Sequence, residues 1–491
     1  MAGDQIVAWI LLFAHIAIVC FASVIISLRR KPQTALAWIM AIIFIPLIGV
    51  TAFLLIGAGR LPRRRREKQH EVNDAMLART EIQSYRVEPE TLGILGSAVL
   101  LNETLGALPM VADNTTALIE EYTGSFDQMI ADIDTATDYV HVEFYILVKD
   151  EMTEPFFDAL ARAAQRGVHV RVLSDFISGF MYPHRKTTQE ALSRMGAEWH
   201  PMLPLKPWRG IWQRPDLRNH RKLVVIDGRI GYTGSQNLID ETYLKAKNIR
   251  KGLHWVELML RVEGPSVGEL DAVFVADWFS ETDEILSLQT LPANDAIREG
   301  SGSAQPVTGI PVQVIPSGPS FENDNNLKLF VLLLHSAQSR ISITSPYFVP
   351  DDSTLQAIVT AASRGIDVEL FVSEAVDQVF VHYAQRSYYQ ALLEAGVAIY
   401  RYRSPAVLHS KHFSIDDRIA VVGSSNMDMR SFSLNMEVSL LIDSEEFVQR
   451  IRLVEDSYRR KSAVLTAEEW KTRPVGGKIL EGVARLTSTL Q

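Results

Sequence analysis

The sequence predicts an α/β protein that consists of two duplicated α/β sandwich domains preceded by two transmembrane helices. Two long uncharged runs open the chain, strand-like and helix-like segments alternate through the remainder, and one polar motif occurs twice. The 491 residues, 47% of them apolar, are ample for two globular domains and an N-terminal anchor. A net charge of −9 disfavours a nucleic-acid enzyme, because binding a phosphate backbone normally requires a basic surface.

The two N-terminal runs extend from Ile6 to Ile26 and from Ala35 to Gly59. Each is long enough to cross a hydrocarbon core of ~30 Å at ~1.5 Å per residue. The first run is too long for a signal peptide, and no basic region precedes it. We therefore expect two transmembrane helices within residues 1–60. Pro46, in the middle of the second run, leaves a re-entrant or interfacial segment as the alternative.

Basic residues beside the two runs set the predicted orientation. The loop between the runs holds three, whereas the segment after the second run holds six, namely Arg60, Arg63, Arg64, Arg65, Arg66 and Lys68. Because the larger cluster favours the cytoplasm, we expect a multi-pass protein of the cell (inner) membrane whose main domains are cytoplasmic. The same basic cluster is a candidate contact for anionic lipid headgroups.

Strand and helix signals alternate in the first half of the remaining chain. Tyr139–Val148 is β-branched and aromatic, as in a strand, and Thr153–Gln165 has apolar residues at helical spacing. Val168–Leu173 then resembles a second strand. This order predicts an α/β sandwich with a parallel or mixed sheet.

The same order returns later, with strands at Arg340–Val349 and Ile366–Val372 and a helix at Thr354–Ser363. The recurrence indicates that a whole domain is duplicated, since the repeat is too long for a solenoid. We predict a juxtamembrane linker at 61–110, a first domain at 111–290, an inter-domain linker at 291–310 and a second domain at 311–491.

A polar motif occurs once in each half. Segments 220–237 and 409–426 align without a gap, and six polar or glycine positions coincide: His220/His409, Lys222/Lys411, Asp227/Asp416, Gly234/Gly423, Ser235/Ser424 and Asn237/Asn426. A His and a Lys two residues apart on a strand project from the same face, ~6.5 Å apart. They can offer a phosphate an imidazole and a positive charge. A single strand histidine is usually structural, but six coincident positions favour a functional pair.

The two copies of H-x-K-x4-D-x6-G-S-x-N resemble the phospholipase D superfamily. Longer strings are similar to the bacterial cardiolipin synthase family, namely Asp216–Lys222, Tyr232–Ser235, Ser345–Asp351 and Asn426–Ser431. The stretch Arg30–Gly49 is similar to the second membrane segment of that family. The resemblance implies two phospholipase D-like domains packed about a pseudo-twofold axis, with both histidines at one phosphorus.

The resemblance also implies roles for the motif residues. His220 is expected to attack and form a phosphohistidine and His409 to act as acid and base, with the reverse order left open. The catalytic and supporting positions carried over from the family are His220, Lys222, Asp227, His409, Lys411 and Asp416, with Ser235, Asn237, Ser424 and Asn426. The two lysines and two asparagines would hold the phosphoryl oxygens. The two aspartates are also expected to pin turns or pair with a basic neighbour rather than to touch substrate.

The family further uses a carboxylate to orient each histidine. Glu437 follows His409 at the usual spacing, whereas Glu257 follows His220 at a longer one. A strand-edge glutamate is the alternative reading of Glu257. No metal or other cofactor is implied, because the lysines already supply cationic stabilisation.

The resulting hypothesis is transfer of a phosphatidyl group between two phosphatidylglycerol molecules, which gives cardiolipin and glycerol. The partner is then a phospholipid substrate, with no nucleic acid and no oligomer required to build the site. A membrane-bound phospholipase D that hydrolyses phospholipids to phosphatidic acid is the alternative, because water can replace the acceptor alcohol. A scaffold without activity is disfavoured because both motif histidines are present.

Overall fold

The computed structural model describes the chain in nine segments: residues 2–29, 32–57, 61, 63–78, 80–106, 108–205, 214–287, 306–321 and 324–486. The chain divides into two compact units, residues 1–60 with 212–216, and residues 61–211 with 217–491. Most of the predicted inter-domain linker (291–310) lies outside the described residues.

The N-terminal unit contains three helices, α1 (Ala2–Arg29), α2 (Pro32–Phe44) and α3 (Pro46–Ile56). They share a small apolar cluster that includes the edge-on ring pair of Trp38 and Phe53, whose centroids lie 5.5 Å apart. The second predicted transmembrane run is broken at Pro46, which begins α3 and has no N–H for a helical hydrogen bond. Among the described residues, no helix is long and apolar enough to cross a membrane, so the two predicted spans are not confirmed.

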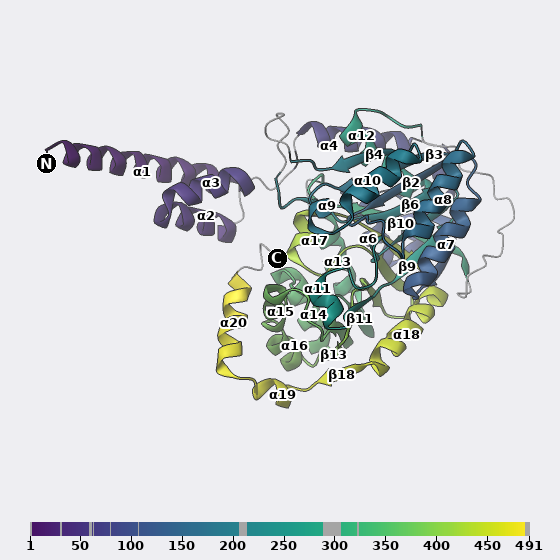
Figure 1. The fold of residues 1–491 in the computed structure, drawn as a ribbon. Helices are drawn as coiled ribbons and strands as arrows, with labels where there is room; N and C mark the ends of the chain where they lie inside the picture. The colour runs from purple at the N-terminus through teal and green to yellow at the C-terminus, as the bar shows by residue number, and fades with distance from the viewer. Residues whose placement is uncertain are drawn as a thin grey trace. The chain divides into compact units, whose positions relative to one another are not determined.

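The larger unit is built on a sheet that contains strands from both halves of the chain (Figure 1). The first half supplies β1 (Met110–Ile119), β2 (Tyr139–Phe144), β3 (His169–Asp175), β4 (Glu198–Met202), β5 (Arg218–Asn219), β6 (Lys222–Ile226), β7 (Ile230–Gly234), β8 (His254–Val256) and β9 (Met259–Glu263). The second half supplies β10 (Val307–Ser317), β11 (Arg340–Thr344), β12 (Asp367–Ser373), β13 (Ala398–Tyr402), β14 (Ala406–Leu408), β15 (His412–Ile415), β16 (Ile419–Gly423), β17 (Asn435–Asp443) and β18 (Ser462–Leu465). Of these strands, β8 and β14 pair with each other in a separate two-stranded sheet.

The strand order follows the same pattern outward from the centre in both directions, except that the second half has an additional edge strand, β18. It runs β18-β13-β12-β11-β15-β16-β17-β10-β1-β9-β7-β6-β2-β3-β4, so β10 and β1 form the central antiparallel pair. On each side, two strands pair in parallel with their inner neighbour, as in β2-β3-β4 and β11-β12-β13. This order confirms an α/β protein with two similar halves.

Helices flank the sheet in both halves. The first half and the segment before it contain α4 (Arg63–Leu77), α5 (Thr80–Tyr85), the 3-10 helix η1 (Pro89–Leu92), α6 (Ile94–Thr104), α7 (Tyr122–Asp134), α8 (Glu154–Gln165), α9 (Ser178–Met181), α10 (Arg185–Arg194), α11 (Ala246–Arg250) and α12 (Ser266–Thr282). The second half contains α13 (Asn325–Ser336), α14 (Asp352–Ser363), α15 (Val379–Arg386), α16 (Tyr389–Ala395), α17 (Met429–Ser433), α18 (Glu445–Arg460), α19 (Ala467–Lys471) and α20 (Val475–Leu486).

Strand β2 shows how the sheet separates two helical layers. Val140, Val142 and Phe144 pack with the apolar residues of α7 and α8. The alternate side chains point to the opposite face, where His141 contacts Asp271 of α12. Because both faces of the strand are covered, all six of its residues are buried.

Helix α4 lies within the segment predicted as a linker, yet it packs against α12. Residues Ser266 to Phe279 of α12 are all buried, as expected for a helix covered on every side. Arg65 pairs with Glu281, and Lys68 donates to the carbonyl of Phe279 near the end of α12. Two members of the basic cluster that was a candidate for lipid binding are therefore largely buried in contacts within the protein.

Candidate active site

Each motif histidine lies where a short strand of its own half pairs with the opposite half. His220 follows β5, which runs parallel to the start of β17, and its amide donates to the carbonyl of Met436 (2.8 Å). His409 follows β14, which runs parallel to β8, and its amide donates to the carbonyl of Val256 (2.8 Å). These cross-connections place both motifs at the junction of the two halves.

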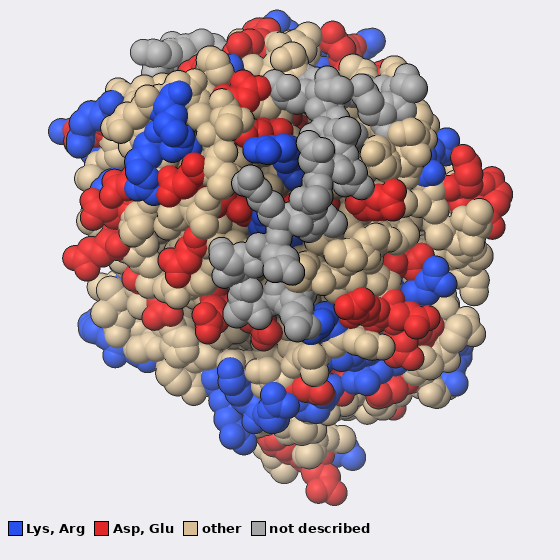
Figure 2. Space-filling model, turned by 90° about the vertical axis from the view of Figure 1, so that its right-hand side faces the viewer, with Lys and Arg blue, Asp and Glu red and all other residues tan. Residues whose placement is uncertain are grey.

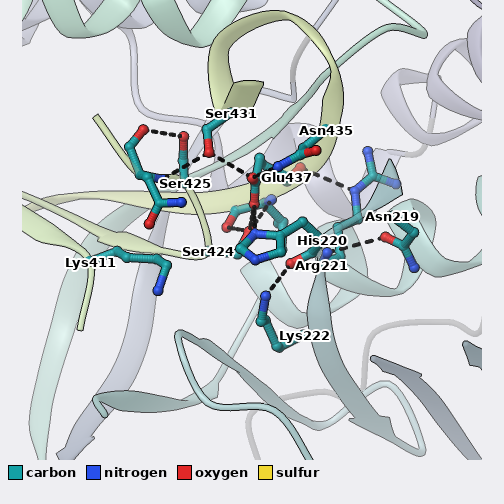
Figure 3. A network of polar contacts seen from close by, with 12 residues as sticks. Asn219, His220, Arg221, Lys222, Lys411, Ser424, Ser425, Ser431, Asn435 and Glu437 are labelled. Carbon is teal, nitrogen blue, oxygen red and sulfur yellow. Dashed lines mark hydrogen bonds and ion pairs between the residues drawn. The ribbon is translucent and has the colours of Figure 1, made fainter. Parts of the chain in front are cut away.

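The histidines and glutamates are paired across this junction. His220 Nδ1 lies 2.9 Å from Glu437 Oε2 (Figure 3), and His409 Nδ1 lies 2.7 Å from Glu257 Oε1. Sequence spacing associates each glutamate with the motif of its own half. The structure instead brings each glutamate to the histidine of the other half, because the residue before it pairs with that histidine's strand.

The electrostatics favour a neutral imidazole beside an ionised carboxylate. Burial lowers the pKa of both histidines to about 4, and the lysines add to the shift while the glutamates oppose it. Burial acts to raise the pKa of Glu437, but His220, Lys222 and the Ser424 hydroxyl outweigh it and leave the pKa below its usual value. A carboxylate at Nδ1 fixes the ring proton there, so that Nε2 keeps its lone pair for phosphorus.

The motif lysines bring positive charge to the same place. Lys222 Nζ donates to the carbonyl of His220 and Lys411 Nζ to that of His409, each at 2.6 Å. Burial lowers the pKa of Lys222 to about 7 and that of Lys411 to about 8. The charge of Lys411 also lowers the pKa of His220, so the two motifs act on each other. Figure 3 shows both ammonium groups facing the space beside the His220 ring.

The Gly-Ser pair of each motif supports a glutamate. Ser235 Oγ donates to Glu257 Oε2 (2.6 Å), and Ser424 Oγ donates to Glu437 Oε2 (2.5 Å). A side chain at Gly234 would place its Cβ only 2.4 Å from the carbonyl oxygen of Leu258. Glycine is therefore required for the close approach of the strands that brings the serine to the carboxylate.

The two motif asparagines differ in their contacts. Asn237 Nδ2 donates to the Tyr243 hydroxyl (2.9 Å), and its Oδ1 accepts from the amide of Ile146 (3.2 Å). The Oδ1 atom of Asn426 is buried and has no hydrogen-bond partner among the described residues. Of the two side chains, Asn426 is the one with a polar atom left for a ligand.

Two further residues complete the environment of the glutamates and were not predicted. The Tyr243 hydroxyl donates to Glu257 Oε1 (3.0 Å), and Ser431 Oγ donates to Glu437 Oε1 (2.9 Å). Each follows the asparagine of its motif by a few residues, beyond the aligned segments 220–237 and 409–426. Comparison of the two motif copies could not identify these residues, because one is a tyrosine and the other a serine. The sequence signal for Ser431 was its place at the end of the string Asn426–Ser431, which resembles the family.

Asp227 and Asp416 lie at the far ends of β6 and β15 from the histidines. Asp227 accepts hydrogen bonds from the amides of Thr137, Asp138 and Tyr139, each at 2.9 Å. Asp416 accepts in the same way from the three amides that precede and begin β11. A strand of five residues spans ~16 Å, so these aspartates fix the start of a neighbouring strand and do not reach the histidine.

Among the described residues, no group of three or more His, Cys, Asp or Glu side chains is arranged to hold a metal ion. On the face in Figure 2, acidic and basic side chains are interspersed over most of the surface. The fold and the paired His–Glu–Lys groups are those of a phospholipase D-like protein, and each His–Glu pair takes one group from each domain.

Comparisons with known proteins agree with this class. The family described as cardiolipin synthase, PLD-like domain, matches residues 129–278 and 330–454, and the phospholipase D-nuclease N-terminal family matches residues 16–57. Cardiolipin synthase A of Pectobacterium carotovorum subsp. carotovorum is 32% identical over 481 residues, which cover 97% of each chain. Cardiolipin synthase A of Serratia proteamaculans is 32% identical over 480 residues, again 97% of each chain. The chain therefore belongs to the cardiolipin synthase family of phosphatidyltransferases.

A solved structure supports the fold. The crystal structure of phosphatidylserine synthase from Haemophilus influenzae superposes with a TM-score of 0.58 and 16% identity, and covers 80% of this chain and 100% of that one. The likeness extends to the architecture, so the two-domain arrangement has an experimental counterpart.

Proposed function

We propose that the protein transfers a phosphatidyl group from one phosphatidylglycerol to another, giving cardiolipin and glycerol through a phosphohistidine. The observation that carries this proposal is the pair of crossed His–Glu contacts, each of which takes one group from each domain. The full-length likeness to Cardiolipin synthase A supports the choice of substrate.

In the first step, Nε2 of His220 attacks the phosphorus of the donor lipid. The neutral imidazole supplies the electron pair, and Lys222 and Lys411 stabilise the charge that develops on the non-bridging oxygens. His409 donates a proton to the oxygen of the departing glycerol as the P–O bond breaks. The anionic phosphodiester raises the pKa of the histidine beside it, which lets His409 carry that proton.

In the second step, His409 accepts the proton of a hydroxyl group on the second phosphatidylglycerol. The oxygen attacks the phosphohistidine, the P–N bond breaks, and the electron pair returns to His220. Protons and phosphoryl groups balance over the cycle, so no cofactor is consumed. Glu437 and Glu257 hold the two rings and stabilise each imidazolium while it exists.

The proposal includes a membrane location, because both lipids reside in a bilayer. Two N-terminal transmembrane segments and a cytoplasmic catalytic unit remain part of it, supported by the apolar runs and by the basic residues after the second run. A reporter fused near residue 300 checks the orientation, and a signal from outside the cytoplasm would reverse it.

The decisive experiment incubates the purified full-length protein with phosphatidylglycerol in mixed micelles, with a chelator present, and identifies the lipids by mass spectrometry. Cardiolipin and glycerol in equal amounts are expected, and His220→Ala and His409→Ala are expected to form no cardiolipin. Phosphatidic acid without cardiolipin would replace the synthase with the hydrolase. A reaction abolished by the chelator would contradict the metal-free mechanism.

A further inference from the structure

Helix α20 has the opposite amphipathicity to an ordinary surface helix. Five of its apolar residues are between 50% and 83% exposed: Val475, Ile479, Leu480, Val483 and Leu486. Its one glutamate, Glu481, is buried and pairs with Arg386 (3.0 Å) and Arg473 (3.1 Å). A surface helix in water normally buries its apolar face, so this arrangement indicates an apolar environment for the exposed face.

The charges of α20 indicate what kind of environment this is. Its exposed charged residues are Lys478 and Arg485, both basic, while its only acidic residue is held inside. Exposed apolar side chains accompanied by basic ones are typical of helices that lie in the interface of an anionic bilayer. A face that packed against another protein would not require that its exposed charged residues all be basic.

The apolar face continues toward the active site through α15, which packs against α20. Val379 and Phe380, at the start of α15, are 51% and 68% exposed. They follow Asp377, which accepts a hydrogen bond from the Tyr347 hydroxyl (2.6 Å). The Tyr347 ring lies 6.1 Å from the ring of His409, so this apolar pair adjoins the site.

The first domain presents a similar pair at the equivalent place. Phe180 and Met181 of α9, which follows β3 as α15 follows β12, are 59% and 56% exposed. Arg185 lies over the Phe180 ring at 3.5 Å, which again joins an apolar side chain to a basic one. Tyr182 comes next, and its ring lies 6.2 Å from that of Tyr243 in the active site.

We propose that α20, together with the pairs Val379–Phe380 and Phe180–Met181, forms an interfacial surface that docks on an anionic phospholipid bilayer. Docking places the active site at the level of the lipid headgroups, where the phosphodiester lies. Figure 1 shows α9, α15 and α20 on the same side of the catalytic unit in that view. The inference rests on the proposed phospholipid substrate, since a lipid must reach His220 and His409.

The first test measures contact with lipid and does not depend on activity. Cys20 is the only cysteine, so Cys20→Ser gives a background in which Ile479→Cys, Phe380→Cys or Leu453→Cys carries a fluorophore. Leu453 on α18 is the matched control, because it is 61% exposed but lies outside the proposed surface. The full-length protein is placed in vesicles of phosphatidylglycerol and phosphatidylcholine that contain nitroxide-labelled lipid. Strong quenching at 479 and 380 and little at 453 are expected; equal quenching at all three overturns the proposal.

A second test uses the physical state of the substrate. Ile479→Ser combined with Val483→Ser is expected to lower turnover of vesicle phosphatidylglycerol at least about tenfold and to leave turnover of a monomeric short-chain phosphatidylglycerol unchanged. Leu453→Ser should change neither. An equal loss on both substrates would overturn the proposal, as would disulfide cross-linking of Ile479→Cys between two chains in place of quenching. If the wild type makes no cardiolipin, the quenching experiment still decides this inference, so the two failures are distinguishable.

Discussion

The two half-sites share their reacting groups and differ in what supports them. In each half-site, the histidine Nδ1 lies within hydrogen-bonding distance of a buried glutamate. The lysine of each motif donates a hydrogen bond to the backbone carbonyl of the histidine in the same motif. The residue between histidine and lysine is Arg221 in the first half and Ser410 in the second. The Arg221 side chain is fully buried, pairs with Asp277 of α12 and donates to the carbonyl of Glu437 (3.1 Å).

This difference indicates which features serve the reaction and which serve one domain. The groups that we propose meet phosphorus are present in both copies. The supporting groups have diverged, with a tyrosine hydroxyl at Glu257 and a serine hydroxyl at Glu437. The His220 side chain is 12% exposed and that of His409 is 6% exposed, which is consistent with His220 as the group that attacks the incoming lipid.

The largest expected effect separates the two histidines. His220→Ala and His409→Ala should each lower kcat by at least about 10^4-fold, because they remove the nucleophile and the acid–base group. Rapid quench with radiolabelled lipid should detect phosphoenzyme in His409→Ala but not in His220→Ala. If phosphoenzyme were found only in His220→Ala, His409 would be the nucleophile and His220 the acid–base group, and the location of the site would be unchanged.

Arg221 provides the sharpest contrast in stability. Arg221→Met leaves Asp277 buried without its cation and should lower the free energy of unfolding by about 3–5 kcal/mol. Burial and Asp277 together raise the pKa of the nearby Glu143, which favours the neutral form of that carboxyl group. Asp277 is therefore the main negative charge that Arg221 neutralises. Ser410→Ala, at the equivalent position, should cost about 1 kcal/mol or less.

Thermal unfolding of the detergent-purified proteins measures this contrast. The double variant Arg221→Met with Asp277→Leu should recover part of the stability, because neither charge is then left alone. If Arg221→Met and Ser410→Ala lowered the free energy of unfolding equally, the difference between Arg221 and Ser410 would make no contribution to stability.

The crossed pairing predicts that Glu437 acts mainly on formation of the phosphohistidine, whereas Glu257 acts on both steps, because His409 is the acid of the first step and the base of the second. Glu437→Gln should slow formation of the phosphohistidine by about 10^2-fold, because Glu437 orients His220. Glu257→Gln should slow the acid–base steps of His409 by a similar factor and leave the phosphoenzyme longer-lived. Pre-steady-state measurement of glycerol release and phosphoenzyme decay distinguishes the two, and the opposite assignment of steps would exclude the crossed arrangement in solution.

The smallest effect concerns the lysines and pH. A lysine must be protonated to bind the phosphodiester, so its contribution is present below its pKa and is lost as the pH rises through it. The pKa is about 7 for Lys222 and about 8 for Lys411. We expect the decline of kcat/KM with pH to become steeper, by about a further factor of ten per pH unit, beyond the first of these values.

Replacement with arginine, which keeps its charge, identifies the responsible lysine. Lys222→Arg should move the alkaline decline upward, toward the pKa of Lys411, whereas Lys411→Arg should leave its onset near pH 7. A profile that is the same in both variants and the wild type would assign the decline to another group.

Much of the duplicated core could be predicted from sequence. Local signals place β2, α8, β3 and their counterparts, because β-branched runs and helical periodicity depend only on neighbours in the chain. The motif residues could be aligned because both copies face the same chemistry. The partner of each glutamate could not be predicted, since spacing along the chain gives no information about which half supplies a neighbouring strand.

The remaining differences have similar physical causes. Hydropathy alone cannot tell a spanning helix from two helices that meet at Pro46, because both are uniformly apolar. The helix α4 was missed because its sequence is largely polar; among its residues whose burial the structure describes, Val72 and Met76 are the deeply buried apolar ones. Tyr243 was missed because its role depends on tertiary contact with Glu257 and not on a repeated pattern.

The crossed contacts also bear on how the protein is made. His220 and Glu437 are separated by 217 residues, so a growing chain exposes the first histidine long before its carboxylate has been synthesised. The first domain, folded alone on the ribosome, has a glutamate without its histidine and a histidine without its glutamate. We therefore expect a prematurely terminated or cleaved chain to be inactive on lipids, because the proposed site takes groups from both domains.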